Sequence, residues 1–302
     1  LRNELEVVSK RFKMLFESSS SAIVLMEPRG SIILSNLAFS RLLEDLNIDF
    51  KKNFGPLLHE LLLNPNKLSD AAHIAFSNDE ISSGEYQLKT QEENKNIWVY
   101  AVINSILSDD MKEYYQLTLH DISKRKSELE KLNIRANYDQ MTNLLNRHSG
   151  ENNIQKLINQ KASFAVILMD LNGFKQINDK YGHDRGDEVL MHVSAILKKS
   201  VRHNDFPCRW GGDEFVLVLK DTGDSSVKLI CEKLQIKIRE PYLLSNSIEV
   251  NIGASIGAAF HPKDSNNMQE LVQLADKAMY KAKEKKTEET HIDVIFSSDI
   301  SK

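Results

Sequence analysis

Residues 206–220, which read FPCRWGGDEFVLVLK, decide the fold of the C-terminal half of the chain. Two segments rich in β-branched and aromatic residues, Phe206–Trp210 and Phe215–Lys220, flank Gly211-Gly212-Asp213-Glu214. Glycine adopts positive φ without steric cost, so a pair of glycines between two apolar segments favours a tight turn. The stretch therefore predicts a β-hairpin that presents two acidic residues, Asp213 and Glu214, at its turn.

A second strand is predicted upstream, over Phe164–Leu171, and it begins with the longest apolar run of the chain, Phe164–Met169. Asp170 lies near its end, where a buried carboxylate costs free energy unless a partner satisfies it. Taken alone, Asp170 is explained by backbone hydrogen bonds at a strand end, and Asp213 by the preference of aspartate for turns. Taken together on adjacent strands, they can converge on Mg²⁺, which prefers carboxylate and phosphate oxygens. This combination predicts phosphoryl-type chemistry on a nucleotide.

The residues after Asp170 extend the predicted nucleotide site. The Leu171–Lys175 turn can offer backbone N–H groups to phosphate, as turns between a strand and a helix often do. Asn178 and Asp187 are placed to read a guanine edge. A carboxylate accepts hydrogen bonds from the N1–H and 2-amino groups of guanine, and adenine has no such donor pair.

Further along the C-terminal half, strands and helices alternate. A helix starting near Asp187 and a second helix over Val227–Ile238 each carry one apolar face, and Leu271–Ala282 forms the inner face of a last helix. A strand pair is predicted from Ser247 to Phe260, and Ile292–Phe296 is a candidate last strand. This order predicts an α+β fold, with a sheet that has helices on one or both faces.

The first part of the chain, residues 1–121, is predicted to be a small α/β module. Its expected helices are 5–16, 37–46 and 56–63, and its expected strands are 22–27, 31–35, 84–89, 97–107 and 114–120, with a turn at Pro28-Arg29-Gly30. Residues 122–138 favour a charged helix in which Ile122, Leu129 and Ala136 recur every seven residues. Two heptads fit a solvated connecting helix and a dimeric signalling stalk equally well.

Length and charge set broad limits. A chain of 302 residues fits two domains, and no apolar stretch is long enough to span a bilayer. The net charge of −4 disfavours general binding to nucleic acid or to an anionic membrane. The only two cysteines, Cys208 and Cys231, lack metal-ligand spacing and suit a reducing compartment. We expect a cytoplasmic location, although a membrane anchor upstream of Leu1 stays compatible with the sequence.

Five motifs in this order resemble the GGDEF family of diguanylate cyclases. They are the literal Gly211–Phe215; the opening motif Asp139–Arg147; the block Asp170–Asp179; its continuation Gly182–Leu190; and Ala275–Lys283. The resemblance covers about 150 residues and implies a palm-like domain, similar to nucleotide cyclases and polymerases, with a central, mostly antiparallel sheet flanked by helices.

The resemblance also implies an activity and roles for the matching residues. Two GTP molecules would be condensed into cyclic di-GMP and two pyrophosphates across a homodimer, with Mg²⁺, or alternatively Mn²⁺, as the cofactor. Asp170, Glu214 and the Leu171 carbonyl would bind the metal. Asp213 and Glu214 would be catalytic, with Asp213 either sharing the metal or helping to deprotonate the attacking 3′-hydroxyl. The implied substrate-binding residues are Phe174, Lys175, Asn178, Asp187, Gly211, Gly212 and Lys283.

Arg202-His203-Asn204-Asp205 matches the RxxD product-inhibition site of the same family. Five residues separate it from Gly211, and this spacing favours the inhibitory role over an exposed turn with an ordinary ion pair. Arginine can bind guanine or phosphate with two hydrogen bonds, while aspartate accepts from guanine. We therefore expect Arg202 and Asp205 to bind cyclic di-GMP.

Two positions and one segment depart from the family pattern. Asn172 stands where a second aspartate is usual, and Asn143 replaces a common glycine of the opening motif. The usual Gly-Arg-Asn segment after Lys283 is replaced by Glu284–Glu288, so the phosphate-binding arginine falls on Thr287. Lys285 or Lys286 can substitute only as point charges, without bidentate geometry. We expect weaker GTP binding rather than loss of the site.

The N-terminal part resembles PAS sensor domains more loosely, through Phe12–Glu17, Gly30–Ile33 with Asn36, and Asp121–Arg125. The implied organisation is a PAS-like sensory domain (1–121), a helical signalling linker (122–138) and a GGDEF domain (139–302). The sequence does not specify a ligand for the sensor. His59 and His73 could in principle bind haem, but an ordinary surface or partly buried histidine is the favoured interpretation of each.

Three other functions stay open. They are a degenerate GGDEF domain that binds GTP or cyclic di-GMP without turnover, a cyclase with a different product such as a mixed adenine–guanine dinucleotide, and an interaction scaffold.

Overall fold

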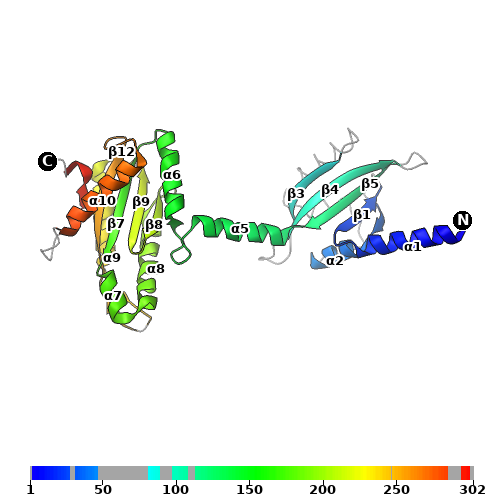
Figure 1. Cartoon of the computed structure of the whole chain (residues 1–302), viewed down its shortest axis with the longest axis horizontal. Helices are drawn as coiled ribbons and strands as arrows, with labels where there is room; N and C mark the ends of the chain where they lie inside the picture. Colours follow the sequence, from blue (N-terminus) through cyan, green and yellow to red (C-terminus); the bar gives the residue numbers. More distant parts are fainter. Residues whose placement is uncertain are drawn as a thin grey trace. The chain divides into compact units, whose positions relative to one another are not determined.

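The computed structural model describes residues 2–27, 31–46, 81–88, 97–107, 113–245, 247–284 and 294–299. The chain divides into two compact units, Leu1–Lys131 and Leu132–Lys302, and the division falls within helix α5 (Ser123–Asn137; Figure 1). Several predicted features lie outside the described residues. These are the turn at residues 28–30, the helix over 56–63, His59, His73 and the 285–288 segment.

The N-terminal unit contains one five-stranded sheet in the order β2-β1-β5-β4-β3, in which all neighbouring strands are antiparallel. Its elements are α1 (Arg2–Ser18), β1 (Ala22–Met26), β2 (Ile32–Ser35), α2 (Leu37–Asp45), β3 (Ser82–Leu88), β4 (Ile97–Leu107) and β5 (Glu113–Asp121). Along β4 the buried side chains alternate, as expected where one face of a sheet covers a core. Leu117 and Leu119 of β5 bury their side chains in the same core.

Asn36 ties three elements of this unit together. Its side-chain oxygen accepts hydrogen bonds from the backbone N–H of Ile23 (2.9 Å) and of Phe39 (3.1 Å), which caps α2. Its amide nitrogen donates to the carbonyls of Phe16 and Ser21 at 3.1 and 2.8 Å. Asn36 is almost fully buried, so these four bonds satisfy a side chain that would otherwise be costly to bury.

The C-terminal unit contains a six-stranded sheet in the order β13-β12-β7-β9-β8-β6. Its elements are β6 (Leu145–Asn146), α6 (Arg147–Asn159), β7 (Phe164–Asn172), α7 (Phe174–Tyr181), α8 (His183–Ser200), β8 (Phe206–Gly211), β9 (Glu214–Lys220), α9 (Asp224–Arg239), β10 (Tyr242–Leu243), β11 (Glu249–Val250), β12 (Gly253–His261), α10 (Met268–Glu284), β13 (Val294–Phe296) and a 3₁₀ turn (Ser297–Asp299). The four central strands are antiparallel, and the edge strands β6 and β13 run parallel to their neighbours. The predicted α+β class and mostly antiparallel sheet are confirmed.

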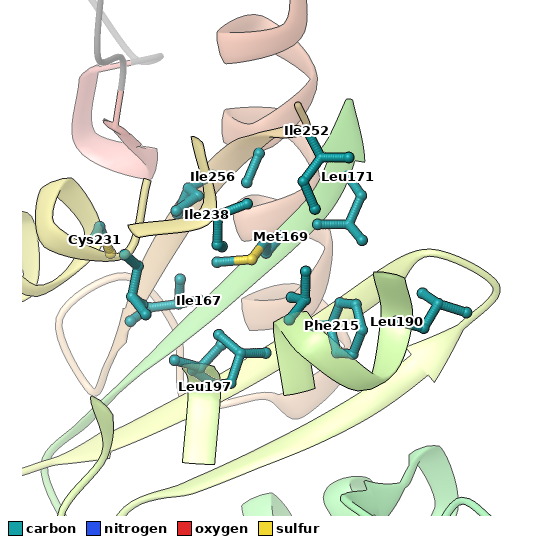
Figure 2. Close-up of a cluster of buried hydrophobic side chains, with 14 of the residues drawn as sticks. Ile167, Met169, Leu171, Leu190, Leu197, Phe215, Cys231, Ile238, Ile252 and Ile256 are labelled. Carbon is teal, nitrogen blue, oxygen red and sulfur yellow. The ribbon is translucent and has the colours of Figure 1, made fainter. Parts of the chain in front are cut away.

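Helices cover both faces of this sheet (Figure 1). Side chains of α7, α8 and α9 pack on one face, and Figure 2 shows part of that core, where Leu190, Leu197 and Cys231 meet sheet residues such as Met169 and Phe215. Side chains of α6 and α10 pack on the other face. Because both faces are covered, β7 and β9 are buried along nearly their whole length and have continuous apolar sequences.

Two sequence predictions about this unit are wrong. The strands within Ser247–Phe260 do not pair with each other: β11 pairs with β10, and β12 lies between β7 and β13. Helix α8 begins at His183 and not near Asp187, because Gly182, at φ 87°, ends α7 and the next helix follows at once. The polar first turn of α8 gave no apolar periodicity to mark it. No helix within the described ranges is long and apolar enough to cross a bilayer.

Candidate functional site

The predicted acidic residues lie together where β7 ends and β8 turns into β9. Asp170 and Glu214 are direct partners across β7 and β9. Asp213 occupies the two-residue turn between β8 and β9, and its carbonyl accepts a hydrogen bond from the Leu171 N–H at 3.3 Å. Direct partners on antiparallel strands project to the same face with Cβ atoms about 5 Å apart. The fold thus brings together three acids from two separate stretches of sequence.

One lysine offsets part of this negative charge. Lys283, in the last turn of α10, donates a hydrogen bond from Nζ to Asp170 Oδ1 at 2.8 Å, and this bond is the main reason that the pKa of Lys283 is raised. Burial, followed by the charge of Asp170, raises the pKa of Asp213. Burial is also the largest cause of the raised pKa of Glu214, to which the charges of Asp170 and of Asp276 on α10 add. The acids therefore lack a full complement of positive charge.

This donor set fits a hard divalent cation. Mg²⁺ is usually held by one or two carboxylates, with substrate phosphates and water completing its six positions. The Lys283 ammonium group, paired with Asp170, marks a position where the acids favour a positive charge. Within the part of the chain that the structure describes, no three Asp, Glu, His or Cys side chains converge into a complete metal cage. The geometry therefore suits a metal that arrives with phosphate ligands more than a permanently bound ion.

The two glycines of the turn have different roles. Gly212 has φ 51°, a left-handed conformation that glycine adopts without penalty. Gly211 pairs with Glu214 at a bulge that follows Arg209 in the β8–β9 ladder. A Cβ atom at either glycine would meet no heavy atom within 4 Å, so the turn has open space beside its backbone. Such space lets a bulky ligand approach the main chain.

Sequence reasoning missed Arg209, whose side chain holds the Gly212–Asp213 turn by hydrogen bonds. Its guanidinium donates to the Gly212 carbonyl from Nε and Nη2, at 3.1 and 2.9 Å, and to both oxygens of Asp139 from Nη1, at 3.1 and 3.2 Å. Asp139 also accepts from the N–H and the hydroxyl of Thr142. Burial opposes ionisation of Asp139, but the bonds from Thr142 and Arg209 outweigh it and lower its pKa. The opening motif is thus joined to the acidic turn.

The predicted guanine-reading residues come from α7 and α8, which cover the other face of the sheet. The Asn178 side-chain oxygen is buried without a hydrogen-bond partner, and it lies over Gly186, where a Cβ atom would come within 1.8 Å of it. Among the described residues, none forms a hydrogen bond or ion pair with the Asp187 carboxylate. Phe174 packs on the core, and Lys175 is exposed in the first turn of α7. Both helices connect to β7 through Gly173, next to the acids.

The predicted inhibitory residues lie at the far end of β8. Asp205 precedes β8 and Gly211 ends it, which separates them by about 20 Å at the usual rise of a strand. The two oxygens of Asp205 accept hydrogen bonds from the N–H groups of Lys220 (2.9 Å) and Arg202 (3.1 Å). The carboxylate therefore stabilises a turn of its own chain, and a ligand would have to share it. The Arg202 side chain is exposed.

The described departures from the family pattern have local structural explanations. Asn143 adopts φ 52°, a left-handed conformation that glycine adopts most readily and that asparagine tolerates better than most other residues. Asn172 exchanges hydrogen bonds with the buried Ser255 on β12, at 3.1 and 3.2 Å. A neutral pair thus occupies the position of the usual second carboxylate.

Comparison with known proteins places this site in a family context. Residues 136–289 match the family described as "Diguanylate cyclase, GGDEF domain". The bifunctional diguanylate cyclase/cyclic di-GMP phosphodiesterase MucR of Pseudomonas aeruginosa is 38% identical over 61% of this chain and 27% of its own length. Signaling protein YkoW of Bacillus subtilis is 30% identical over 91% of this chain and 34% of its own length. This chain therefore spans about a third or less of these two relatives.

Other relatives are named as diguanylate cyclases or as cyclic di-GMP phosphodiesterases. Among solved structures, the coiled coil and GGDEF domain of DgcB from Caulobacter crescentus, in complex with c-di-GMP, aligns with a TM-score of 0.52. The alignment has 23% identity and covers 58% of this chain and 93% of that one. At this identity the likeness concerns the fold, and it agrees with the palm-like sheet described above.

Proposed function

This chain belongs to the GGDEF family of diguanylate cyclases, and on that premise we propose that it condenses two GTP molecules into cyclic di-GMP and two pyrophosphates. The observation that supports this most directly is the pairing of Asp170 with Glu214 beside the open turn that contains Asp213. A pair of strand-end carboxylates next to accessible backbone suits a nucleoside triphosphate bound with its metal.

Asp170 and Glu214, with the Leu171 carbonyl, would hold Mg²⁺ or Mn²⁺. The chemistry that the metal supplies when bound is neutralisation of the charge that develops on the phosphate and the leaving group. The raised pKa of Asp213, caused mainly by burial, makes this carboxylate a better proton acceptor than an ordinary aspartate. In our proposal Asp213 takes the proton of the 3′-hydroxyl. A 3′-oxygen–phosphorus bond then forms at the α-phosphate, and the bond to pyrophosphate breaks.

Lys283 would change partners when substrate binds. In the free site its ammonium group is held by Asp170. With Mg²⁺ or Mn²⁺ held by Asp170 and Glu214, Lys283 would leave Asp170 and contact the terminal phosphates. Gly211 and Gly212 would leave room for the nucleotide, and Lys175 would add charge from the first turn of α7.

Guanine would be bound by Asn178 and Asp187, on the opposite face of the sheet from the acids. The nucleotide would therefore pass over the end of β7, where the chain turns at Gly173 into α7. Among the described residues, the Asn178 oxygen and the Asp187 carboxylate are acceptors without donors, and the N1–H and 2-amino groups of guanine are such donors.

One copy would hold one GTP, so the reaction would need two copies facing each other. Helix α5 supports such pairing, because Leu129 and Leu132 are more than half exposed and no residue of the helix is buried. In our proposal the N-terminal unit is a PAS-like sensor that regulates this pairing, and its separate sheet and core are consistent with an independent module. Asp139, two residues after α5, would transmit a change to the turn through Arg209.

Product inhibition through Arg202 and Asp205 is part of the same proposal. Its distance from the acidic turn suits a second site more than a part of the first. Arg202→Ala is expected to weaken inhibition by cyclic di-GMP and to leave the initial rate unchanged. An unaltered inhibition curve would remove this part of the proposal.

A binding module without turnover is the second candidate, favoured by the neutral Asn172–Ser255 pair in place of a carboxylate. Incubation of the whole chain with GTP and Mg²⁺, followed by chromatography of the products, separates the two candidates. We expect cyclic di-GMP and pyrophosphate from the wild type and none from Asp213→Ala. Binding of GTP without any product from the wild type would favour the module. Incubation with ATP and GTP together tests the alternative of a mixed product.

A further inference from the structure

Helix α8 holds the segment after α9 at two points, one helical turn apart. Glu188 and His192, four residues apart on α8, contact Ser245 and Tyr242 respectively. Tyr242 begins β10, and Ser245 follows it in the β10–β11 hairpin. We refer to these four residues as the α8 clamp. Its first point lies next to Asp187, which the proposed function assigns to guanine.

The Glu188 contact uses both carboxylate oxygens. Oε2 accepts a hydrogen bond from the Ser245 N–H at 2.8 Å, and Oε1 accepts one from the Ser245 hydroxyl at 2.7 Å. Arg185, one turn earlier on α8, forms an ion pair with Glu188 and donates a hydrogen bond to the Ser245 hydroxyl. The N–H of Ser245, followed by its hydroxyl, lowers the pKa of Glu188, so the clamp is made by the ionised carboxylate.

The second point is a ring stack. The rings of His192 and Tyr242 lie 3.9 Å apart between centroids, with their planes inclined by 20°. Burial lowers the pKa of His192, while the charge of Glu240 opposes this shift. The stack is therefore made by a neutral ring near pH 7, and phenylalanine can reproduce its shape.

Val189 and Leu190 pack in the apolar core, and the clamp adds the polar contacts that hold the start of α8. Its N-cap, Gly182, has no side chain to cap the first turn. The Asp187 carboxylate itself has no hydrogen-bond or ion-pair partner among the described residues, so its position follows the helix backbone. Adjacent residues on a helix point about 100° apart. Glu188 can thus be bound to the hairpin while Asp187 stays free for a ligand.

We propose that the α8 clamp sets the orientation of Asp187 and thereby the selectivity of this chain for the 2-amino group of guanine. Glu188 and His192 are positioning residues in this scheme, since neither contacts the nucleotide. The inference rests on the proposed role of Asp187, but it concerns selectivity and not turnover. It also gives the β10–β11 hairpin, which is outside the large sheet, a function at the nucleotide site.

The test compares GTP with inosine triphosphate, which lacks only the 2-amino group. Equilibrium binding of each nucleotide to the whole chain, together with product formation, is measured for Glu188→Ala and His192→Ala. The conservative variants are Glu188→Gln and His192→Phe, and Asp184→Ala is the matched control. Asp184 is an exposed acid in the first turn of the same helix.

We expect the wild type to bind GTP more tightly than inosine triphosphate. Glu188→Ala should reduce this preference about fivefold, which corresponds to part of one charge-assisted hydrogen bond. His192→Ala should reduce it less. His192→Phe and Asp184→Ala should retain it, and Glu188→Gln should fall between wild type and Glu188→Ala.

Binding that weakens equally for both nucleotides would mean that the clamp only stabilises the fold, and would overturn the inference. An unchanged preference in Glu188→Ala, or no preference in the wild type, would overturn it as well. If the wild type makes no cyclic di-GMP but the preference changes as expected, the cyclase proposal fails and the clamp stands. The two conclusions are therefore separable.

Discussion

The contact between Asp139 and Arg209 gives a quantitative prediction for Asp139→Asn. Asparagine keeps Oδ1, which accepts from Thr142 and from Arg209 Nη1, but places an amide N–H₂ where Oδ2 now accepts a second hydrogen bond from Nη1. The substitution removes the charge of one partner and places a donor at one of the two contacts between the guanidinium and this side chain. Its effect should therefore exceed that of an ordinary change on the surface.

The size of the effect follows from the burial of the pair. The side chains of Arg209 and Asp139 are 15% and 24% exposed, so solvent screens their attraction only in part. Hydrogen bonds to charged groups contribute about 1.5–3 kcal/mol, and we expect a loss of about 2 kcal/mol in the free energy of unfolding of the C-terminal unit. For a unit of this size the midpoint of thermal unfolding should fall by about 4–8 °C.

The pH dependence has a defined sign. The pKa of Asp139 is lowered in the folded state, mainly because the bonds from Thr142 and Arg209 outweigh burial. A carboxylate with a lowered pKa stabilises the fold fully above its unfolded pKa of about 4, and this contribution disappears as pH falls through the folded pKa. The difference between wild type and Asp139→Asn should therefore be constant near neutral pH and shrink below about pH 4.

Tryptophan fluorescence can report on each unit separately, because the chain has two tryptophans, Trp98 and Trp210. In a Trp98→Phe background, Trp210 next to the glycine turn follows urea unfolding of the C-terminal unit. A double-mutant cycle with Arg209→Gln should give a coupling of at least about 1 kcal/mol. If Asp139→Asn leaves both stability and turnover unchanged, or if the two substitutions are additive, the pair does not support the turn.

Three further predictions follow from single contacts. Gly186→Ala places a Cβ atom 1.8 Å from the Asn178 oxygen, so the Asn178 side chain must move. In initial-rate measurements we expect KM for GTP to rise about tenfold. The free energy of unfolding should change by less than about 1 kcal/mol. Lys283→Met keeps the side-chain length but removes the charge beside Asp170. The substitution should raise KM for GTP about tenfold or more. Unchanged kinetics would argue against binding of the terminal phosphates by Lys283. Asp213→Asn should abolish turnover yet raise the midpoint of thermal unfolding slightly, because burial and the Asp170 charge disfavour the ionised form; a lower midpoint would contradict the raised pKa.

The central strands and the acidic turn could be predicted because their signals are local. The apolar run that ends at Asp170 and the glycine pair before Asp213 each specify a strand or a turn within a few residues. Once both are strands of one sheet, antiparallel pairing brings Asp170 opposite Glu214. Neither prediction required knowledge of a distant partner.

The parts that sequence reasoning missed depend on distant partners. Arg209 binds Asp139, 70 residues away, and Glu188 binds Ser245, 57 residues away. Each of these side chains is polar and sits in an ordinary local pattern, so nothing near it in the sequence indicates its contact. The pairing of β11 with β10 was missed for a similar reason, since strands of two residues have no periodicity to recognise.

Stability and function are related in opposite ways at Asp139 and at Asp213. At Asp139 the carboxylate is satisfied by three donor groups, so the charge that the proposed signalling path needs also stabilises the fold. At Asp213 the carboxylate is partly buried near other acids, so folding works against the charge that the proposed reaction needs. Neutralising Asp139 should therefore lower stability and turnover together, whereas neutralising Asp213 should separate them. If the turn served only to stabilise the fold, neutralising either carboxylate should lower stability. Opposite effects on stability are expected if the turn binds a cation through Asp213 while the Asp139–Arg209 pair holds the turn in place.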